Sequence, residues 1–166
     1  MSQTAITVIF SSDRQKVLLI KRRDVPVWVL PGGGIEKNET PLQAAQREAE
    51  EETGYKVEIT KQVGEYFPIN RLSKHTFLFE GRISSGHSQI NQEAKEIVFF
   101  ALDQLPKLIP PPYPEWIKEA HLNPQKLIKR KLTEVNYSAF FKNVVLHPVL
   151  ILRFLLSRIN LHINSD

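Results

Sequence analysis

The chain has 166 residues, 42% of them hydrophobic, as expected of a globular protein with a real core. It contains no cysteine, which excludes disulfides, zinc–thiolate sites and a thiol nucleophile. The formal net charge of +4 is unevenly placed: residues 1–106 hold 13 Lys and Arg against 14 Asp and Glu, whereas residues 107–166 hold 9 against 4. The positive charge therefore belongs to the C-terminal third and says little about the substrate of the remainder.

The N-terminal residues have no basic segment followed by a long apolar core, so we expect no secretory signal. No stretch reaches about 18 uncharged apolar residues, so no plain transmembrane span is expected. Together with the absence of cysteine, these features predict a cytoplasmic protein.

Most of the chain up to residue 106 is predicted to form strands, because short apolar or alternating runs are separated by turn residues. The predicted strands are 4–10, 16–21, 27–30, 56–63, 72–82 and 96–102. A polar loop is predicted over 81–91, and one helix interrupts the strands. This order predicts an α/β fold.

The helix is predicted over 41–53 from local signals alone. Thr40 is a good N-cap, Pro41 suits the first helical position and Gln43 completes a capping box. Gly54 is a natural residue to follow the last turn.

Three carboxylates share one face of this helix. Glu48, Glu51 and Glu52 are spaced i, i+3 and i+4, whereas Glu50 points away and Arg47 can pair with Glu51. Such a set, with oxygen donors only, suits a hard cation such as Mg²⁺ or Mn²⁺. The alternative is an ordinary solvated acidic face, which the helix caps and the flanking glycines disfavour.

A glycine run, Gly32 to Gly34, precedes the helix in the stretch PGGGIE. Glycines let the backbone approach a ligand closely. A turn that needs glycine for its geometry alone is the other interpretation, and both can hold.

These residues have the spacing of the Nudix hydrolase signature, G-x5-E-x7-R-E-U-x-E-E-x-G-U, in which U is apolar. The matching residues are Gly33, Glu39, Arg47, Glu48, Ala49, Glu51, Glu52, Gly54 and Tyr55. The chain therefore resembles a Nudix hydrolase. The resemblance covers about residues 4–106 and implies an α/β/α sandwich with a mixed sheet. We accordingly expect a Nudix domain over 1–106 and a basic, apolar extension over 107–166.

The resemblance implies metal-assisted attack of water on a pyrophosphate phosphorus, with Mg²⁺ or Mn²⁺ as cofactor. It assigns catalysis to Glu48, Glu52 and Glu96, and metal binding to Glu48, Glu51, Glu52 and a glycine carbonyl, Gly33 or Gly32. It assigns support of the substrate or of the site to Gly32, Gly34, Glu39, Arg47, Glu93 and Arg23.

Two of these assignments have strong alternatives. The family often supplies a further acid from a loop, and Glu93 or Glu96 could be that acid or only a charged strand end; we prefer Glu96. Arg22 and Arg23 follow the predicted strand 16–21 and could face a phosphate, although a solvated strand end is the interpretation that we favour.

Beyond Pro106 the stretch 110–114 is predicted to be a stiff Pro-rich linker. Helices are predicted over 115–122, 124–135 and 138–161, the last interrupted near Pro148. The apolar C-terminal helix must be covered, and packing on the sandwich or in a homodimer is favoured over peripheral contact with a membrane.

The predicted function is metal-dependent hydrolysis of a pyrophosphate bond in a nucleoside diphosphate linked to another moiety. The substrate is expected to be a nucleotide-type small molecule, a nucleoside triphosphate or a nucleotide derivative, and an ADP-ribose or nucleotide-sugar pyrophosphatase is one alternative. No nucleic-acid partner is expected, because the PGGGIE loop differs from the PQGGI form of RNA 5′-end hydrolases. A nucleotide-binding or regulatory module without turnover is the alternative from another class.

Overall fold

The computed structural model describes residues 2–122, 125–146, 148, 149 and 152. In chain order its elements are β1 (Gln3–Ile9), β2 (Lys16–Arg22), β3 (Trp28–Val29), β4 (Gly32–Gly34), α1 (Pro41–Thr53), β5 (Tyr55–Pro68), β6 (His75–Gly86), β7 (Ala94–Ala101), α2 (Tyr113–Leu122), β8 (Ile128–Leu132) and α3 (Tyr137–Leu146).

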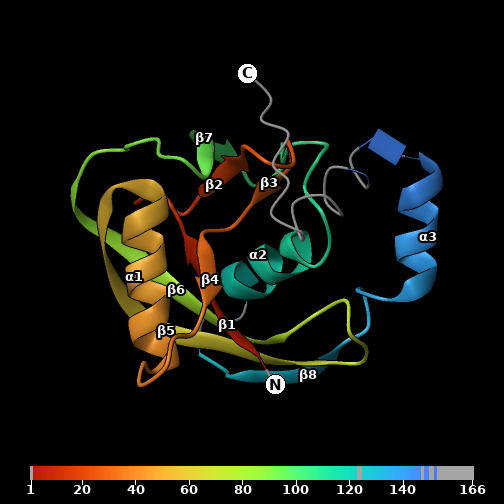
Figure 1. Cartoon of the computed structure of the whole chain (residues 1–166). Helices are drawn as coiled ribbons and strands as arrows, with labels where there is room; N and C mark the ends of the chain where they lie inside the picture. Colours follow the sequence, from red (N-terminus) through yellow and green to blue (C-terminus); the bar gives the residue numbers. More distant parts are fainter. Residues whose placement is uncertain (1, 123–124, 147, 150–151, 153–166) are drawn as a thin grey trace.

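The described strands form two sheets (Figure 1). The five-stranded sheet has the order β4-β1-β6-β5-β8, and the three-stranded sheet has the order β3-β2-β7. In the larger sheet β1 runs parallel to β6 and β5 runs parallel to β8, while the other pairs are antiparallel. The predicted mixed sheet is therefore confirmed.

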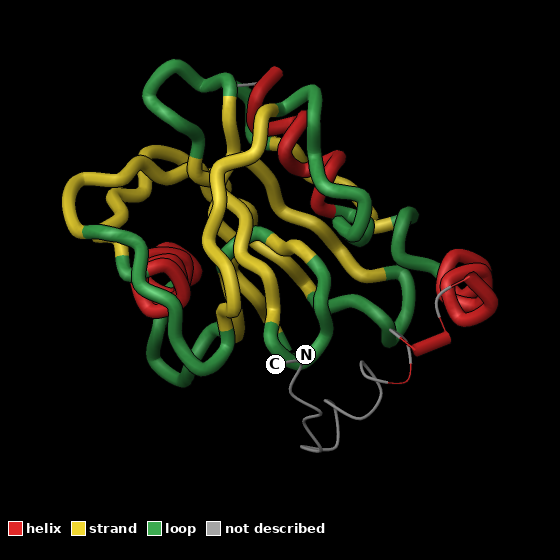
Figure 2. The backbone as a smooth tube through the Cα atoms, turned by 90° about the horizontal axis from the view of Figure 1, so that it is seen from above, coloured by secondary structure: helices red, strands yellow, loops and turns green. Residues whose placement is uncertain are grey.

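The strands lie between α1 and α2, as Figure 2 shows. Successive side chains of β1 point to opposite faces. Ala5 and Ile9 belong to the clusters that α1 covers, whereas Ile6 and Val8 belong to the largest core cluster, which contains α2. The architecture is thus the α/β/α sandwich that the sequence predicted.

Helix α1 has the predicted bounds, and both of its ends have the expected caps. The Thr40 hydroxyl accepts the Gln43 N–H at 3.3 Å, and the Gln43 side chain accepts the Thr40 N–H at 2.9 Å. Gly54 follows the last turn with φ +77°, and its N–H donates to the Glu50 carbonyl at 2.8 Å. The side of α1 that packs on the strands is made of small buried residues, Ala44, Ala45 and Ala49. These small side chains let the helix pack closely on the sheet. The close packing sets how far the acidic face of the helix lies from β4.

Several strands differ from the prediction. Strand β4 was not predicted, because three glycines carry no strand propensity. Strand β6 continues to Gly86, through the first half of the segment predicted to be a loop. It does so because β5 is long enough to pair with it as far as Tyr55↔Gly86.

Beyond residue 106, helix α2 and strand β8 pack into the sandwich. Trp116 and Ile117 of α2 and Leu132 of β8 are buried in the largest core cluster. Helix α2 begins at Tyr113, so the last two residues of the predicted linker are helical. The helix predicted over 124–135 is wrong, because residues 128–132 form β8, which pairs in parallel with β5. The domain boundary at 106 stays a prediction.

Helix α3 lies apart from the rest of the chain in both views (Figures 1 and 2). It confirms the start of the predicted helix at 138 to within one residue. Tyr137, Phe141 and Leu146 are each more than half exposed. Most of the predicted helix after residue 146 lies outside the described residues. Within the described part of the chain, no helix is long and apolar enough to cross a membrane.

Candidate functional site

The glycine strand β4 lies directly beside α1. It pairs antiparallel with β1, with Gly33 opposite Ala5. A Cβ built on Gly33 would lie 2.5 Å from the Glu48 carboxylate, and one on Gly32 would lie 2.4 Å from the Ala5 carbonyl oxygen. Glycine at position 32 therefore lets the strand pack against the backbone of β1, and glycine at position 33 leaves the space that the Glu48 carboxylate occupies. At Gly34, by contrast, an added Cβ would meet no described atom within 4 Å.

Glu52 is held against this strand by the backbone. Its carboxylate accepts the Gly32 N–H at 2.7 Å. Burial is the main cause of a pKa of about 8 for Glu52, and the nearby charges of Glu48 and Glu93 contribute to the rise. The bond from Gly32 and the positive charge of Arg22 act in the opposite direction. A carboxyl group of this kind holds a proton at neutral pH unless a cation replaces it.

Glu48 is the second half-buried acid of the site. Burial raises its pKa above the ordinary value, and the charges of Glu51 and Glu93 add to this. The bond to Arg47 acts in the opposite direction without cancelling the rise. Glu48 and Glu52 are therefore near enough to repel each other in their charged forms.

Arg47 contacts most of the remaining acids. Its guanidinium donates to both carboxylate oxygens of Glu39, at 2.8 and 3.0 Å, and to Glu48 at 2.9 Å. It also donates to Glu51 at 3.2 Å, which confirms the predicted pair, and to the Gly34 carbonyl at 3.1 Å. The bonds from Arg47 lower the pKa of Glu39, so this carboxylate stays charged. Glu39 thus fixes Arg47, and Arg47 fixes the loop and two acids of α1.

The donor set fits a hard divalent cation in its chemistry, because every side-chain donor is a carboxylate oxygen. The crowding of Glu48, Glu52 and Glu93 also favours a cation, since it raises the pKa of two of these acids. Within the described residues, however, no three acidic or histidine side chains already converge on one point. Arg47 holds Glu48 and Glu51, and Gly32 holds Glu52, so a cation would have to draw these carboxylates together.

The family model of the NUDIX domain matches residues 1–120. The chain belongs to the Nudix family. The match includes α2, which the sequence-based boundary at residue 106 left out of the domain.

Relatives of this Nudix protein carry several different activities in their names. A Bacillus subtilis protein provisionally named 8-oxo-dGTP diphosphatase is 40% identical over 81 residues, which are 49% of this chain and 54% of the relative. An ADP-ribose pyrophosphatase of Methanocaldococcus jannaschii is 36% identical over 99 residues, 56% of this chain and 59% of the relative. This chain thus spans little more than half the length of these relatives.

Among solved structures, a UDP-X diphosphatase superposes with a TM-score of 0.65 at 27% identity. The superposition covers 77% of this chain and 66% of that one.

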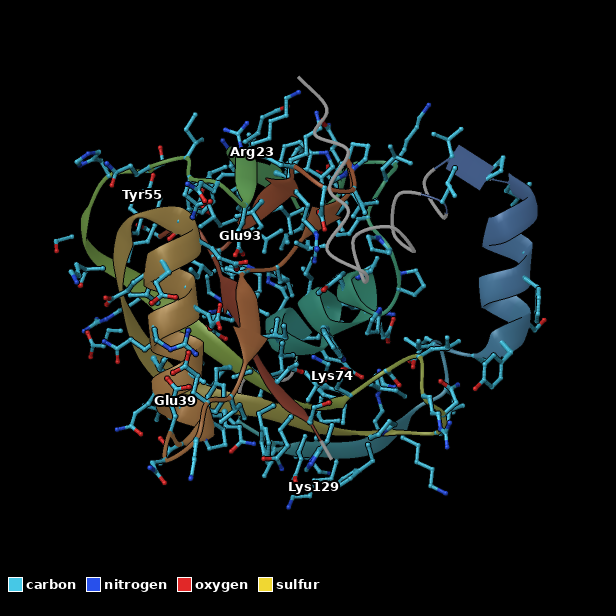
Figure 3. All side chains as sticks on the ribbon, in the orientation of Figure 1. Arg23, Glu39, Tyr55, Lys74, Glu93 and Lys129 are labelled. Carbon is cyan, nitrogen blue, oxygen red and sulfur yellow. The ribbon has the colours of Figure 1, made fainter. Side chains whose placement is uncertain are left out.

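Of the two candidate further acids, Glu93 is the one whose charge acts on the acids of the Nudix helix, whereas the preferred Glu96 is paired with a lysine. The Glu96 carboxylate bonds to the Lys21 ammonium at 2.6 Å, because strand register places the two residues opposite each other on β7 and β2. Glu93 precedes β7, and its charge acts on both Glu48 and Glu52. Figure 3 labels Glu93 where the start of β7 approaches the end of α1.

The two arginines at the end of β2, Arg22 and Arg23, have different contacts in the structure. The interpretation favoured for Arg23 was a solvated strand end, and in the structure its Nε donates to the Asn91 carbonyl at 2.9 Å, beside the loop that carries Glu93. Arg22, the other arginine considered at the end of this strand, acts on Glu52 through its charge and bonds to Asp24 at 2.8 Å. No pattern in a single sequence indicates that the charge of Arg22 acts on Glu52, because the two residues come near each other only in the folded chain.

Proposed function

We propose that this protein hydrolyses a pyrophosphate bond in a nucleoside diphosphate linked to another moiety, with Mg²⁺ or Mn²⁺ as cofactor. The observation that carries the proposal is the packing of Glu48 and Glu52 against the glycine strand: Gly33 leaves room for one carboxylate and the Gly32 N–H binds the other. The names of the relatives, a diphosphatase and a pyrophosphatase, agree with this chemistry.

Each residue of the site would have a separate task. The divalent cation, when bound, would polarise the phosphate and make the attacking water more acidic. Glu52, whose pKa is raised to about 8, and Glu48, whose pKa is also raised, would be the candidates to take up the proton of the attacking water. Arg47 and Glu39 hold the loop beside the helix, and the Gly32 N–H fixes the orientation of Glu52.

Two substrate classes fit this proposal, because the relatives include both. One is a nucleoside triphosphate, as the name of the Bacillus subtilis relative indicates, and the other is a nucleotide sugar or ADP-ribose. In this proposal the acidic helix and the glycine strand would serve the phosphates that both classes share, so they do not discriminate between the two classes.

The test is a product-resolved assay with a panel of nucleoside triphosphates, including oxidised ones, and of nucleoside diphosphate derivatives, each with Mg²⁺ or Mn²⁺. We expect a nucleoside monophosphate as product, released with pyrophosphate from a triphosphate or with a phosphorylated partner from a derivative. The activity should vanish with EDTA and with Glu52→Gln. Absence of turnover on every compound, combined with nucleotide binding, would instead support a binding module.

A further inference from the structure

The Asn91 side chain joins the end of α1 to the start of β7. Its Nδ2 donates to the Glu51 carbonyl of α1 at 2.7 Å. Its Oδ1 accepts the N–H of Glu93 at 2.8 Å and the N–H of Ala94 at 2.7 Å. One amide group therefore uses both its donor and its acceptor, and it links the backbone of the acidic helix to the backbone that carries Glu93.

The same short segment is also tied to β2. The Arg23 Nε donates to the Asn91 carbonyl at 2.9 Å, and the Arg23 N–H donates to the Glu93 carbonyl at 3.0 Å. A further bond, from the Gln89 N–H to the Thr53 carbonyl at 2.9 Å, holds the preceding loop to the end of α1. Asn91 is the residue at which the connections to α1, β2 and β7 meet.

This connection bears on the site because Glu93 is itself exposed. Packing therefore contributes little to its position, and the position must come from the backbone on either side of it. Three of the bonds described above involve the backbone of Glu93 or the adjacent Ala94, and two of these three are made by Asn91.

We propose that Asn91 is a positioning residue that holds Glu93 beside the carboxylates of α1, so that Glu93 contributes to divalent-metal binding. The proposal rests on the proposed metal-dependent function. If the side chain only closed a local turn, its bonds to Glu93 and Ala94 would be enough. The bond to Glu51 has no part in that turn, and it fixes the distance between two elements that both supply acids to the site.

The experiment measures Mn²⁺ binding to the full chain by calorimetry without substrate. Residues that orient metal ligands typically change metal affinity 10- to 100-fold, so we expect Asn91→Ala to weaken binding by about tenfold or more. Asn91→Asp keeps an acceptor for Glu93 and Ala94 but cannot donate to Glu51. It should therefore weaken binding too, and it supplies the test if Asn91→Ala does not fold.

Asn70 provides a matched control. Its Nδ2 donates to the Val135 carbonyl at 2.7 Å, and its Oδ1 accepts the Leu72 N–H at 2.8 Å, at the turn between β5 and β6. Asn70→Ala removes the same kinds of bond outside the site. We expect it to lower the melting temperature without changing Mn²⁺ affinity, and an equal loss of affinity in both variants would overturn the proposal.

A double-mutant cycle tests whether Asn91 acts through Glu93. Glu93→Gln should weaken Mn²⁺ binding, and adding Asn91→Ala to it should change the affinity less than twofold. Unchanged binding in Glu93→Gln, or a full further loss in the double variant, would overturn the proposal. A chain that binds Mn²⁺ in this pattern but hydrolyses no nucleotide would contradict the proposed function and leave the role of Asn91 intact.

Discussion

Arg47 neutralises acids that would otherwise repel one another, because its planar guanidinium group carries several N–H donors. Bonds to two oxygens of Glu39, to Glu48, to Glu51 and to a backbone carbonyl use donors that a lysine ammonium cannot supply in this geometry. The arrangement leaves Glu52, which Arg47 does not contact through any of these bonds, as the acid most dependent on an external cation.

The first prediction at the residue scale concerns these carboxylates. Glu48→Gln and Glu52→Gln keep the size of the side chain but remove its charge. We expect each to lower kcat at least about a hundredfold, the scale of a lost acid–base or metal-binding group. Steady-state kinetics with saturating Mg²⁺ is the measurement.

Glu50→Gln is the matched control on the same helix. Glu50 bonds to Lys56 at 2.9 Å, on another face of α1, so we expect kcat to change less than about twofold. Equal losses in Glu50→Gln and Glu52→Gln would contradict the assignment of the acidic face.

The second prediction concerns pH. The pKa of Glu52 is about 8 in the folded chain against 4.5 for a free side chain. Between these values the folded state holds a proton that the unfolded state has lost, so unfolding becomes easier as pH rises. The stabilisation from this group is complete below pH 4.5 and is lost as pH passes through about 8.

Melting temperatures of the metal-free protein between about pH 6 and about pH 9 test this linkage. The wild-type chain should lose more stability over that range than Glu52→Gln, which cannot ionise. Saturating Mg²⁺ should reduce the difference, since the metal binds the deprotonated acid. Parallel curves for the two metal-free proteins would contradict the raised pKa.

At the scale of elements, the glycine strand and the acidic helix form one unit. A Cβ at Gly33 would meet the Glu48 carboxylate at 2.5 Å, and the flexible end of that side chain would have to move. We therefore expect Gly33→Ala to lower kcat/KM by about 10- to 100-fold, the scale of small misplacements in an active site. The melting temperature should change little, because the clash is with a movable side chain.

The adjacent glycine gives the comparison. Gly34→Ala meets no described atom within 4 Å, so kcat/KM should stay within about twofold of the wild type. If Gly34→Ala were as damaging as Gly33→Ala, the loss would reflect the backbone of the loop and not contact with Glu48.

The sequence predicts α1 to the residue, since its caps and its acidic spacing are local features. Strand β4 escaped prediction, because three glycines form a strand only through pairing with β1 and contact with Glu48. Strand β8 was taken for a helix, because a lysine- and leucine-rich segment has helix propensity. Its pairing with β5, more than 60 residues earlier in the chain, decides otherwise.

The candidate site also contains residues that local sequence predicts and residues that depend on contacts between distant strands. The acids of α1 follow from helix periodicity, whereas the choice between Glu93 and Glu96 depends on strand register. Glu96 falls opposite Lys21 and is held there. Nothing local to residues 93–96 carries that information, because Lys21 lies on a strand 75 residues away.

At the scale of the whole molecule, the positively charged C-terminal part of the chain contains helix α3. This helix exposes the side chains of Tyr137, Phe141 and Leu146. A patch of exposed apolar side chains marks an interaction surface, and the partner that we expect there is a second copy of the chain. Deleting residues 137–166, which removes α3, should convert dimers to monomers in light scattering while leaving kcat within about twofold.

A membrane surface is the competing cover for α3. In that case the full chain should float with anionic vesicles, salt should weaken the binding, and the deletion should abolish it. Flotation of this kind with an unchanged oligomeric state would contradict the dimer.

Helix α1 also has an unusual charge distribution along its axis. The aligned peptide dipoles leave partial negative charge at the C-terminal end of a helix, where basic side chains are normally favoured. Here the last turn contains Glu50, Glu51 and Glu52 and no basic residue. A divalent cation at this end would therefore serve as the counter-charge of the helix dipole as well as a cofactor. We expect prolonged chelation to fray the last turn first, so that hydrogen exchange and proteolysis there report metal loss before the rest of the fold does.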